Sequence, residues 1–283
     1  MKTLSSLKLE TVCQLKEVQI EEAALDAQLL ITHVLEINPV DYAIEGDLLI
    51  DDKSLTEIQR LVDLRLSRMP MSQIFGDKEF WSLNFKVTKD TLTPRPDSET
   101  LIEACLKEIN NPKAKLRILD MGTGTGCLLL TLLSEFPNAK GLGTDISEKA
   151  LSVAKENAKN LSLLKRADFQ ISNWTKNLAD QDKFDIIISN PPYIGLVEKE
   201  SLSPEVRDHE PDTALFSGPE GLNDYRLIAD QVFTHLKPDG LIIIEVGHTQ
   251  ADNVKEIFIS SGFNNITVYK DLGHRNRCLV IRQ

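Results

Sequence analysis

The stretch LRILDMGTGTGCLLLTLLSEF, residues 116–136, decides the fold class of this chain. It opens with a short apolar strand pattern over 116–120, continues into a loop with glycine at every second position, and closes with an apolar helix pattern over 128–136. A glycine-rich turn between a strand and a helix lets the backbone turn tightly and lets a ligand approach without meeting a Cβ atom. The stretch therefore predicts an α/β unit with a ligand site at its loop.

Strand and helix patterns alternate on the C-terminal side of this stretch. A helix pattern fills 146–161, and strand patterns lie near 141–145, 167–171, 184–189 and 240–246. Strands separated by helices predict a parallel, doubly wound sheet. The last residues, 265–283, read as two strands joined by a turn, which predicts an antiparallel edge.

The front of the chain has a different pattern, because its first 70 or so residues are helical. One helix pattern covers 21–36, and a second covers 54–69 and begins with a capping-box pair, Ser54 and Glu57. In residues 72–93, aromatic and β-branched residues between turn residues predict a β-hairpin. We therefore expect a small helical domain, with no catalytic motif of its own, followed by a hairpin.

The net charge of −11 argues against a protein that holds nucleic acid by its phosphates. Such binding needs clustered Lys and Arg, and the sequence has no long basic run. Residues 1–75 hold 7 basic and 13 acidic residues, so the helical front is acidic in its own right. A solvated helical surface explains this most simply, and a docking face for a basic partner is the alternative.

The sequence carries no signal for a membrane or for export. No apolar run approaches the roughly 20 residues needed to span a bilayer. The N-terminus lacks an apolar core segment and carries Glu10 and Glu17, so it indicates neither a secretion signal nor a transit peptide. The four cysteines are scattered and form no metal or redox pair, which is typical of reduced thiols in a cytoplasmic protein.

The spacing of the loop glycines decides among nucleotide-like ligands. A dinucleotide fingerprint needs its third glycine one residue later, where Cys127 stands, and a phosphate loop needs Gly-Lys-Ser/Thr, which is absent. The Gly-x-Gly-x-Gly form of residues 122–126 suits a ligand without a pyrophosphate. Asp145 ends the next strand, where its carboxylate can accept hydrogen bonds from both hydroxyls of a ribose. A glycine turn alone is more often structural, but with Asp145 it predicts a site for S-adenosylmethionine.

The stretch SNPPYIG, residues 189–195, follows an apolar strand, and ligands of open α/β sheets bind beyond such strand ends. A Pro-Pro turn ending a strand is structurally sensible by itself, because proline cannot donate to a sheet ladder. The Asn190 side-chain oxygen and the Pro191 carbonyl, however, can accept both hydrogens of a planar NH₂ group. That arrangement builds electron density on the nitrogen and aims its lone pair at a sulfonium methyl, and Tyr193 can stack on the flat target group. The motif therefore predicts a clamp for methyl transfer to a planar nitrogen.

Together these motifs resemble those of class I S-adenosylmethionine-dependent methyltransferases, and more narrowly the bacterial release-factor glutamine methyltransferases of the HemK/PrmC family. The resemblance covers the helical front, the hairpin, and the motifs LTPRPDSE (92–99), LDMGTGTGCL (119–128), TDIS (144–147), SNW (172–174), SNPPYI (189–194) and EPDTALFSGPEGL (210–222). NPPY alone is shared with adenine methyltransferases, whereas PRPDSE and the helical front make the match more specific. Two departures are small: Ser98 stands where the family often has Thr, and Cys127 replaces a common small residue.

The resemblance implies the fold and the domain organisation. The fold is α/β, a Rossmann-like class I methyltransferase with a seven-stranded, mostly parallel sheet and a C-terminal antiparallel strand. A small helical bundle and a β-hairpin linker would precede it. The implied domains are an N-terminal helical substrate-docking domain over 1–72, a β-hairpin linker over 73–98, and the methyltransferase domain over 99–283.

The resemblance also implies the site residues and the substrate. The cofactor S-adenosyl-L-methionine, which becomes S-adenosyl-L-homocysteine, would contact Gly122, Thr123, Gly124, Thr125, Gly126, Asp145, Trp174 and Asn190. The substrate glutamine would be held by Asn190, Pro191, Pro192 and Tyr193, of which Asn190, Pro191 and Tyr193 are the implied catalytic residues. That glutamine belongs to the Gly-Gly-Gln loop of peptide chain release factors and is methylated on its side-chain amide nitrogen. We expect a monomer in the cytoplasm, acting in translation termination, with no metal, no direct nucleic acid and no membrane.

Two other functions stay open at this point. The nearest is a nucleic-acid methyltransferase acting on an exocyclic amino group of adenine or guanine, which shares the clamp but should bring a basic surface. The other is a binding module without catalysis, against which the intact Asn190 and glycine loop argue. A nicotinamide dehydrogenase is disfavoured by the glycine spacing.

Several polar residues allow a structural interpretation beside a functional one. Trp174 alone is compatible with a core position. Either a functional role or capping of the following helix fits the charged residues Arg95, Asp97 and Glu99. A polar turn between the last two strands is predicted for His274, Arg275 and Arg277.

Overall fold

The computed structural model, which describes residues 2–283, divides the chain into two compact units. The helical unit contains the chain up to Phe75 together with Pro204–His209, and the sheet unit contains Gly76–Ser203 and Glu210–Gln283. The chain therefore crosses between the units three times. The domain boundaries at residues 72 and 98 stay a prediction, and the hairpin that follows the helices belongs to the sheet unit.

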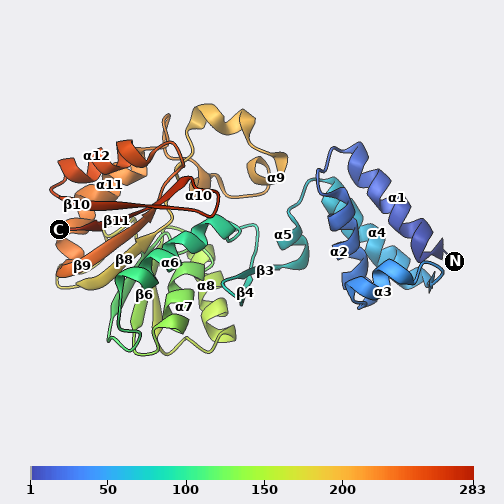
Figure 1. Cartoon of the computed structure of the whole chain (residues 1–283), viewed down its shortest axis with the longest axis horizontal. Coiled ribbons are helices and arrows are strands. Elements are labelled where there is room, and N and C mark those ends of the chain that lie inside the picture. Colours follow the sequence, from blue (N-terminus) through green and yellow to red (C-terminus); the bar gives the residue numbers. More distant parts are fainter. Residues whose placement is uncertain (1) are drawn as a thin grey trace. The chain divides into compact units, whose positions relative to one another are not determined.

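The helical unit is a group of short and medium-length helices (Figure 1). Buried apolar side chains of these helices form a small core. Its helices are α1 (Leu4–Glu17), α2 (Ala23–Leu35), α3 (Pro39–Ile44), α4 (Asp52–Leu66), α5 (Met71–Phe75) and α9 (Pro204–Arg207), and the short strands β1 (Lys2–Thr3) and β2 (Leu49–Ile50) pair antiparallel. The predicted helix over 21–36 is α2. Its buried side carries Ala27, Leu30 and Ile31, whereas Leu25 and Leu29 stay 48% and 39% exposed.

The start of α4 differs from the prediction. The N-cap is Asp51, whose carboxylate accepts the Ser54 N–H at 3.0 Å and the Ser54 hydroxyl at 2.7 Å. The predicted capping box at Ser54 and Glu57 is wrong, because Glu57 pairs with Arg60 at 2.7 Å instead. A carboxylate at the N-cap satisfies the free N–H groups and also opposes the positive end of the helix dipole, so Asp51 is the better cap.

A cluster of four charged residues ties Pro204–His209 into the helical unit. Arg65 lies 2.7 Å from Asp26 and 3.0 Å from Glu205, and Arg68 lies 2.9 Å from the other oxygen of Glu205. Burial acts to raise the pKa of Glu205, but its hydrogen bonds, including those from Arg68 and Arg65, lower it below the ordinary value. The Gln73 side chain also donates to the His209 carbonyl at 2.9 Å. The helical unit is thus completed by a segment from far along the chain.

The sheet unit is built on a seven-stranded sheet with the order β10-β11-β9-β8-β5-β6-β7. The strands are β5 (Arg117–Met121), β6 (Lys140–Asp145), β7 (Ala167–Ile171), β8 (Phe184–Ser189), β9 (Leu236–Glu245), β10 (Asn265–Lys270) and β11 (Asn276–Arg282). All neighbours pair parallel except β11, which is antiparallel to both β9 and β10. The predicted class I sheet with its C-terminal antiparallel strand is confirmed.

Helices cover both faces of this sheet (Figure 1). One face packs α6 (Glu99–Glu108), α7 (Cys127–Glu135) and α8 (Glu148–Asn160), and the other packs α11 (Asn223–Val232) and α12 (Ala251–Ser260). Side chains of a strand point to alternate faces, and β8 follows this rule. Ile186 and Ile188 join the first sheet core, which lies on the face of α6, α7 and α8, and Ile187 joins the second sheet core, which lies on the face of α11 and α12. All three are fully buried. Between residues 2 and 283, no helix is long and apolar enough to cross a membrane.

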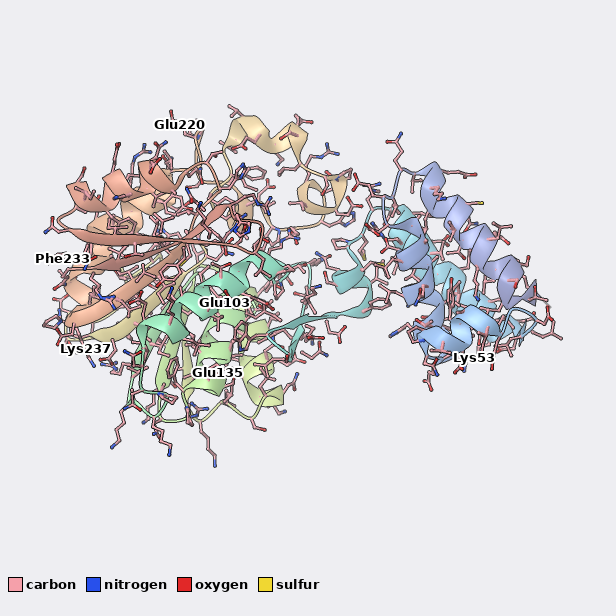
Figure 2. The ribbon with its side chains drawn as sticks, viewed as in Figure 1. Lys53, Glu103, Glu135, Glu220, Phe233 and Lys237 are labelled. Atoms are coloured by element: carbon pink, nitrogen blue, oxygen red, sulfur yellow. The ribbon has the colours of Figure 1, made fainter. Side chains whose placement is uncertain are left out.

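Short elements complete the sheet unit. They are the hairpin strands β3 (Asp77–Phe80) and β4 (Leu83–Lys86), the 3₁₀ turns η1 (Pro96–Ser98), η2 (Leu196–Ser201) and η3 (Phe233–His235), and the helix α10 (Asp212–Leu215). The hairpin turns through Trp81 and Ser82 at φ values of +51° and +58°, which non-glycine residues rarely adopt. Two hydrogen bonds hold Trp81 there. Its backbone N–H donates to Glu99 at 3.0 Å, and its indole donates at 2.8 Å to Glu135, labelled in Figure 2.

Asn157, a fully buried residue of α8, connects the hairpin to the glycine loop. Its side-chain oxygen accepts the Lys86 N–H at 2.7 Å. Its side-chain nitrogen donates to the Lys86 carbonyl at 3.1 Å and to the Thr125 carbonyl at 2.9 Å. One amide therefore satisfies three backbone groups, two from the hairpin and one from the loop.

We predict that Asn157→Ala lowers the free energy of unfolding of the sheet unit by about 2–4 kcal/mol, because these three backbone groups lose their hydrogen bonds to the buried side-chain amide. Urea unfolding followed by tryptophan fluorescence measures this, since both tryptophans, Trp81 and Trp174, belong to the sheet unit. The control is Asn160→Ala, an exposed residue of the same helix, which should change the value by less than about 0.5 kcal/mol. Equal effects of the two variants would contradict the assigned role.

Candidate active site

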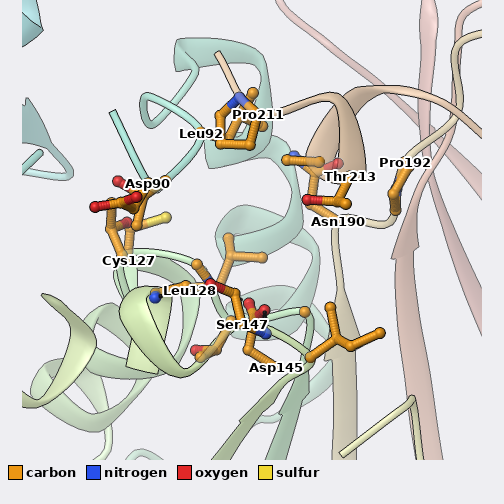
Figure 3. Close-up of a pocket in the computed structure, with 18 of the residues that line it drawn as sticks. Asp90, Leu92, Cys127, Leu128, Asp145, Ser147, Asn190, Pro192, Pro211 and Thr213 are labelled. Carbon is orange, nitrogen blue, oxygen red and sulfur yellow. Dashed lines mark hydrogen bonds between the residues drawn. The ribbon is translucent and has the colours of Figure 1, made fainter. Parts of the chain in front are cut away.

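A cavity of about 320 Å³ opens at the carboxyl ends of β5, β6 and β8. This is the edge at which open α/β sheets bind ligands. Its lining includes residues from four segments of the chain, 90–98, 122–128, 145–150 and 211–216, together with Ser172, Asn173, Trp174, Asn190, Pro192 and Asp224. In Figure 3, Asp145 and Ser147 lie on the lower side of the cavity, and Asn190 and Thr213 lie on the upper side. All of these residues belong to the sheet unit.

The glycine loop joins β5 to α7 and needs glycine for two different reasons. Gly122, Gly124 and Gly126 all have positive φ, at +70°, +54° and +81°. A Cβ on Gly122 would lie 3.5 Å from the Trp174 ring, and one on Gly124 would meet nothing, so these two keep the cavity floor open. A Cβ on Gly126 would press on Leu130 at 3.1 Å, so Gly126 allows α7 to pack. Gly126 is also the one loop glycine outside the lining, and its contact with a cofactor stays a prediction.

Asp145 ends β6 with its carboxylate held by the backbone. One oxygen accepts the Gly124 N–H at 3.0 Å, and the other accepts the Ser147 N–H at 2.9 Å. Burial raises the pKa of Asp145, although these N–H groups oppose the shift. Each carboxylate oxygen can accept a second hydrogen bond, so the group keeps capacity for a ligand diol.

Trp174 forms an apolar wall beside the loop. Its indole N–H donates to Asp224 at 3.2 Å, and its ring lies next to Gly122. The residue has a positive φ of +55°, a conformation that tryptophan rarely adopts and that turns its ring to the cavity. Trp174 is only partly buried, and it also packs against the second sheet core. The functional and structural interpretations of this residue therefore both have support.

Asn190 follows β8 directly and is half-buried in the cavity wall. Its side-chain nitrogen donates to the Ser98 hydroxyl oxygen at 3.1 Å, which leaves its side-chain oxygen as the group available to a ligand. Of the other clamp residues, Pro192 lines the cavity and Pro191 is buried. Tyr193 is not among the lining residues, because its ring packs on the second core and its hydroxyl donates to Glu245 at 3.4 Å. The roles of Pro191 and Tyr193 stay predictions.

The PRPDSE turn is held by long-range partners, not by capping of α6. Arg95 pairs with the buried Glu210, which also accepts the Thr93 N–H at 3.3 Å. The Asp97 carboxylate lies 2.8 Å from the Arg277 guanidinium. Burial raises the pKa of Glu210, an effect that the Arg95 charge opposes. These contacts fix the upper wall of the cavity.

Sequence reasoning missed four residues that form or support this wall. They are Ser98, Glu210, Glu245 and Arg277. The prediction that Arg277 merely forms a polar turn is wrong, because its side chain is only 7% exposed and pairs with Asp97 and with Asp271 at 3.3 Å. A carboxylate at the end of the apolar run GLIIIEV was the available signal for Glu245.

The chemistry of the lining fits a cationic ligand better than a phosphate. Asp90, Asp145 and Asp224 face the cavity, and the one arginine in the lining, Arg95, is already paired with Glu210. S-adenosylmethionine carries a sulfonium and an ammonium charge, a ribose diol and an adenine ring, which match these carboxylates, Asp145 and Trp174. Among residues 2–283, no group of three or more His, Cys, Asp or Glu side chains is arranged to hold a metal ion.

Comparisons with known proteins agree with this geometry. The family model of a methyltransferase domain matches residues 112–275, and that of the PrmC N-terminal domain matches residues 9–76. The release factor glutamine methyltransferase of Cereibacter sphaeroides is 40% identical over 96% of this chain and 95% of its own length. The release factor glutamine methyltransferase of Caulobacter vibrioides is 37% identical over 98% and 96%. A methyltransferase structure from Pyrococcus furiosus, 18% identical with a TM-score of 0.52 over 81% of this chain and 98% of that one, shows the likeness of fold alone.

We predict that Asp145→Ala weakens S-adenosylmethionine binding by about 10- to 100-fold, because the diol loses a charged acceptor worth about 1.5–3 kcal/mol. Isothermal titration calorimetry measures the dissociation constant directly. Asp168→Ala, which removes an exposed carboxylate from the neighbouring strand β7, is the matched control and should bind as the unchanged protein does. Unaltered affinity in Asp145→Ala would exclude Asp145 as a cofactor ligand.

Proposed function

The chain belongs to the release factor glutamine methyltransferases, and from this premise we propose that it methylates the glutamine of the Gly-Gly-Gln loop of a peptide chain release factor. The methyl group goes to the side-chain amide nitrogen. The observation that carries the proposal is the orientation of Asn190, whose amide nitrogen is engaged by Ser98 while its oxygen is left for a donor. The primary amide of a glutamine side chain has two N–H donors, which the Asn190 oxygen and the Pro191 carbonyl can accept.

The cofactor half of the cavity is assigned from the residues around the glycine loop. S-adenosyl-L-methionine, when bound, supplies a methyl group on a sulfonium. Asp145 would accept hydrogen bonds from the ribose hydroxyls, and Trp174 would lie against the adenine. The remaining part of the cofactor would contact the glycine loop at Gly122, Thr123, Gly124 and Thr125. The acidic lining would stabilise its positive charges.

The substrate half of the cavity holds the amide for in-line attack. The Asn190 side-chain oxygen and the Pro191 carbonyl accept the two N–H bonds, which fixes the plane of the amide and raises electron density on its nitrogen. The nitrogen lone pair would form the new N–C bond in line, the S–C electron pair would stay on sulfur, and the excess proton would leave to water. Positioning of this kind can supply about 7–11 kcal/mol in the best cases, so no strong base is needed. Pro192 and Tyr193 complete the clamp.

The proposed partner and location follow from the same reaction. The helical unit, with its 7 basic and 13 acidic residues up to position 75, is the proposed docking element for the release factor. A substrate of the translation machinery supports a cytoplasmic location.

Methylation of an exocyclic amino group of a nucleic acid is the competing reaction, since it would use the same clamp. The charge of the cavity disfavours it. Three aspartates line the cavity, and Arg95 is the lining's one basic residue, so phosphates find no free cation there.

We predict that the purified protein transfers label from radioactive S-adenosylmethionine to an unmodified bacterial release factor. Asn190→Ala should lower kcat by about 10²- to 10³-fold, the usual cost of removing one group that holds the reacting atoms. Mass spectrometry of the labelled factor locates the methyl group, which should lie on the Gly-Gly-Gln glutamine.

Two controls make this experiment decisive. Asn264→Ala, an exposed residue before β10, should retain full activity. A pool of DNA and RNA offered in the same assay should remain unlabelled. Label on nucleic acid, or an Asn190→Ala variant as active as the unchanged protein, would overturn the proposal.

A further inference from the structure

The first and last residues of the Asn-Pro-Pro-Tyr motif are both connected to one buried carboxylate. Glu245 ends β9 and is only 1% exposed. One of its oxygens accepts the Ser98 hydroxyl at 2.5 Å, and Ser98 in turn accepts the Asn190 amide at 3.1 Å. Its other oxygen accepts the Tyr193 hydroxyl at 3.4 Å. Glu245 itself is outside the cavity lining, so it acts through these neighbours.

The sheet register explains why Glu245 reaches this position. Strands β8 and β9 run parallel, and Ser189 is paired with Ile244. The next residues along the chain, Asn190 after β8 and Glu245 at the end of β9, therefore lie at the same edge of the sheet. The Glu245 backbone is fixed as well, because its carbonyl accepts the hydroxyl of the fully buried Tyr225 at 2.9 Å.

The direction of each hydrogen bond in this chain is dictated by the charge of Glu245. An ionised carboxylate only accepts, so the single Ser98 hydroxyl hydrogen must point to it. The Ser98 oxygen can then only accept from Asn190, which turns the Asn190 NH₂ group toward Ser98 and its oxygen toward the cavity. An amide or a protonated acid at position 245 can donate to Ser98, and Ser98 can then donate to Asn190 in the opposite sense.

We infer that Glu245 is a positioning residue that, through Ser98, holds the Asn190 amide with its oxygen toward the substrate and, directly, holds Tyr193. The inference rests on the proposed function, because it assigns Asn190 the task of accepting a substrate N–H. Without the ionised Glu245, the Asn190 amide can turn its donor side to the cavity, where it would repel the N–H groups of the substrate.

The first test compares the isosteric variant Glu245→Gln with the unchanged protein. Its kcat for methyl transfer to the release factor should fall about 10- to 100-fold, the usual loss when a group that orients a catalytic residue is removed. Its dissociation constant for S-adenosylmethionine should change less than about twofold, because Asp145 and the glycine loop are untouched. The matched control is Glu108→Gln, a part-buried carboxylate with a similar hydroxyl partner, Tyr269 at 2.5 Å, which should keep full kcat.

A double-variant comparison separates the relay from general damage. Ser98→Thr keeps the hydroxyl and should stay active, whereas Ser98→Ala should lose the part of the Glu245→Gln effect that is transmitted through Asn190. Combining Ser98→Ala with Glu245→Gln should cost no more than the larger single loss, because both break one chain of hydrogen bonds. Losses that multiply would show independent effects and would overturn the inference.

The pH dependence of kcat provides a readout that a merely structural role would not move. Burial raises the pKa of Glu245 to about 7, while the Ser98 hydroxyl and Arg277 oppose the shift. Because the ionised form of Glu245 is the active one, kcat of the unchanged protein should rise with pH through about 7. The kcat of Glu245→Gln should show no such rise in this pH range. The charged or titratable groups that face Glu245 are Asp97, Cys127, Tyr193, Tyr225, Arg277 and Cys278.

The deciding experiment needs no substrate. The side-chain ¹⁵N–¹H₂ signals of Asn190, identified by their loss in Asn190→Ala, report the partner of its NH₂ group. They should shift in Glu245→Gln and in Ser98→Ala and stay in place in Glu108→Gln. Unshifted signals in Glu245→Gln would overturn the inference whether or not the protein labels a release factor. An unchanged protein that labels no release factor would contradict the proposed function alone.

Discussion

The parallel alignment of β5, β6, β8 and β9 is the constraint on which the rest of the structure depends. Because these strands run in one direction, their carboxyl ends meet at one edge, and each end delivers a polar group there. The ends supply the glycine loop, Asp145, Asn190 and Glu245 in turn. The buried isoleucines of β8 hold the register, since a slip of one residue would turn every side chain to the opposite face.

The glycine loop, Asp145 and Asn190 could be predicted from the sequence because each of them is encoded locally. A strand, a glycine loop and a helix occur within residues 116–136, and Asp145 and Asn190 each follow an apolar strand directly. The alternation of strand and helix patterns was likewise sufficient to predict the parallel sheet. Local pattern and tertiary structure agree at these positions, as expected where one segment carries both the fold and the site.

The residues that support the site, such as Ser98 and Glu245, could not be predicted, because their roles depend on partners that are distant in the sequence. Ser98 is separated from Asn190 by 92 positions and from Glu245 by 147. Only the strand register and the path of the PRPDSE turn bring them together, and neither can be read from one sequence. The error at the start of α4 has a different origin. It is local, because Asp51 lies only three residues before Ser54 and its carboxylate accepts both the Ser54 N–H and the Ser54 hydroxyl.

The discontinuous make-up of the helical unit bears on how the protein is made. Arg68 leaves the ribosome 137 residues before its partner Glu205, an interval of roughly 7 to 27 s at ordinary rates of synthesis. During that time the first helices exist without α9, and Arg65 has only Asp26 as its ionic partner. The N-terminal helices therefore acquire their last segment only after most of the sheet has been synthesised, which links the maturation of one unit to the synthesis of the other.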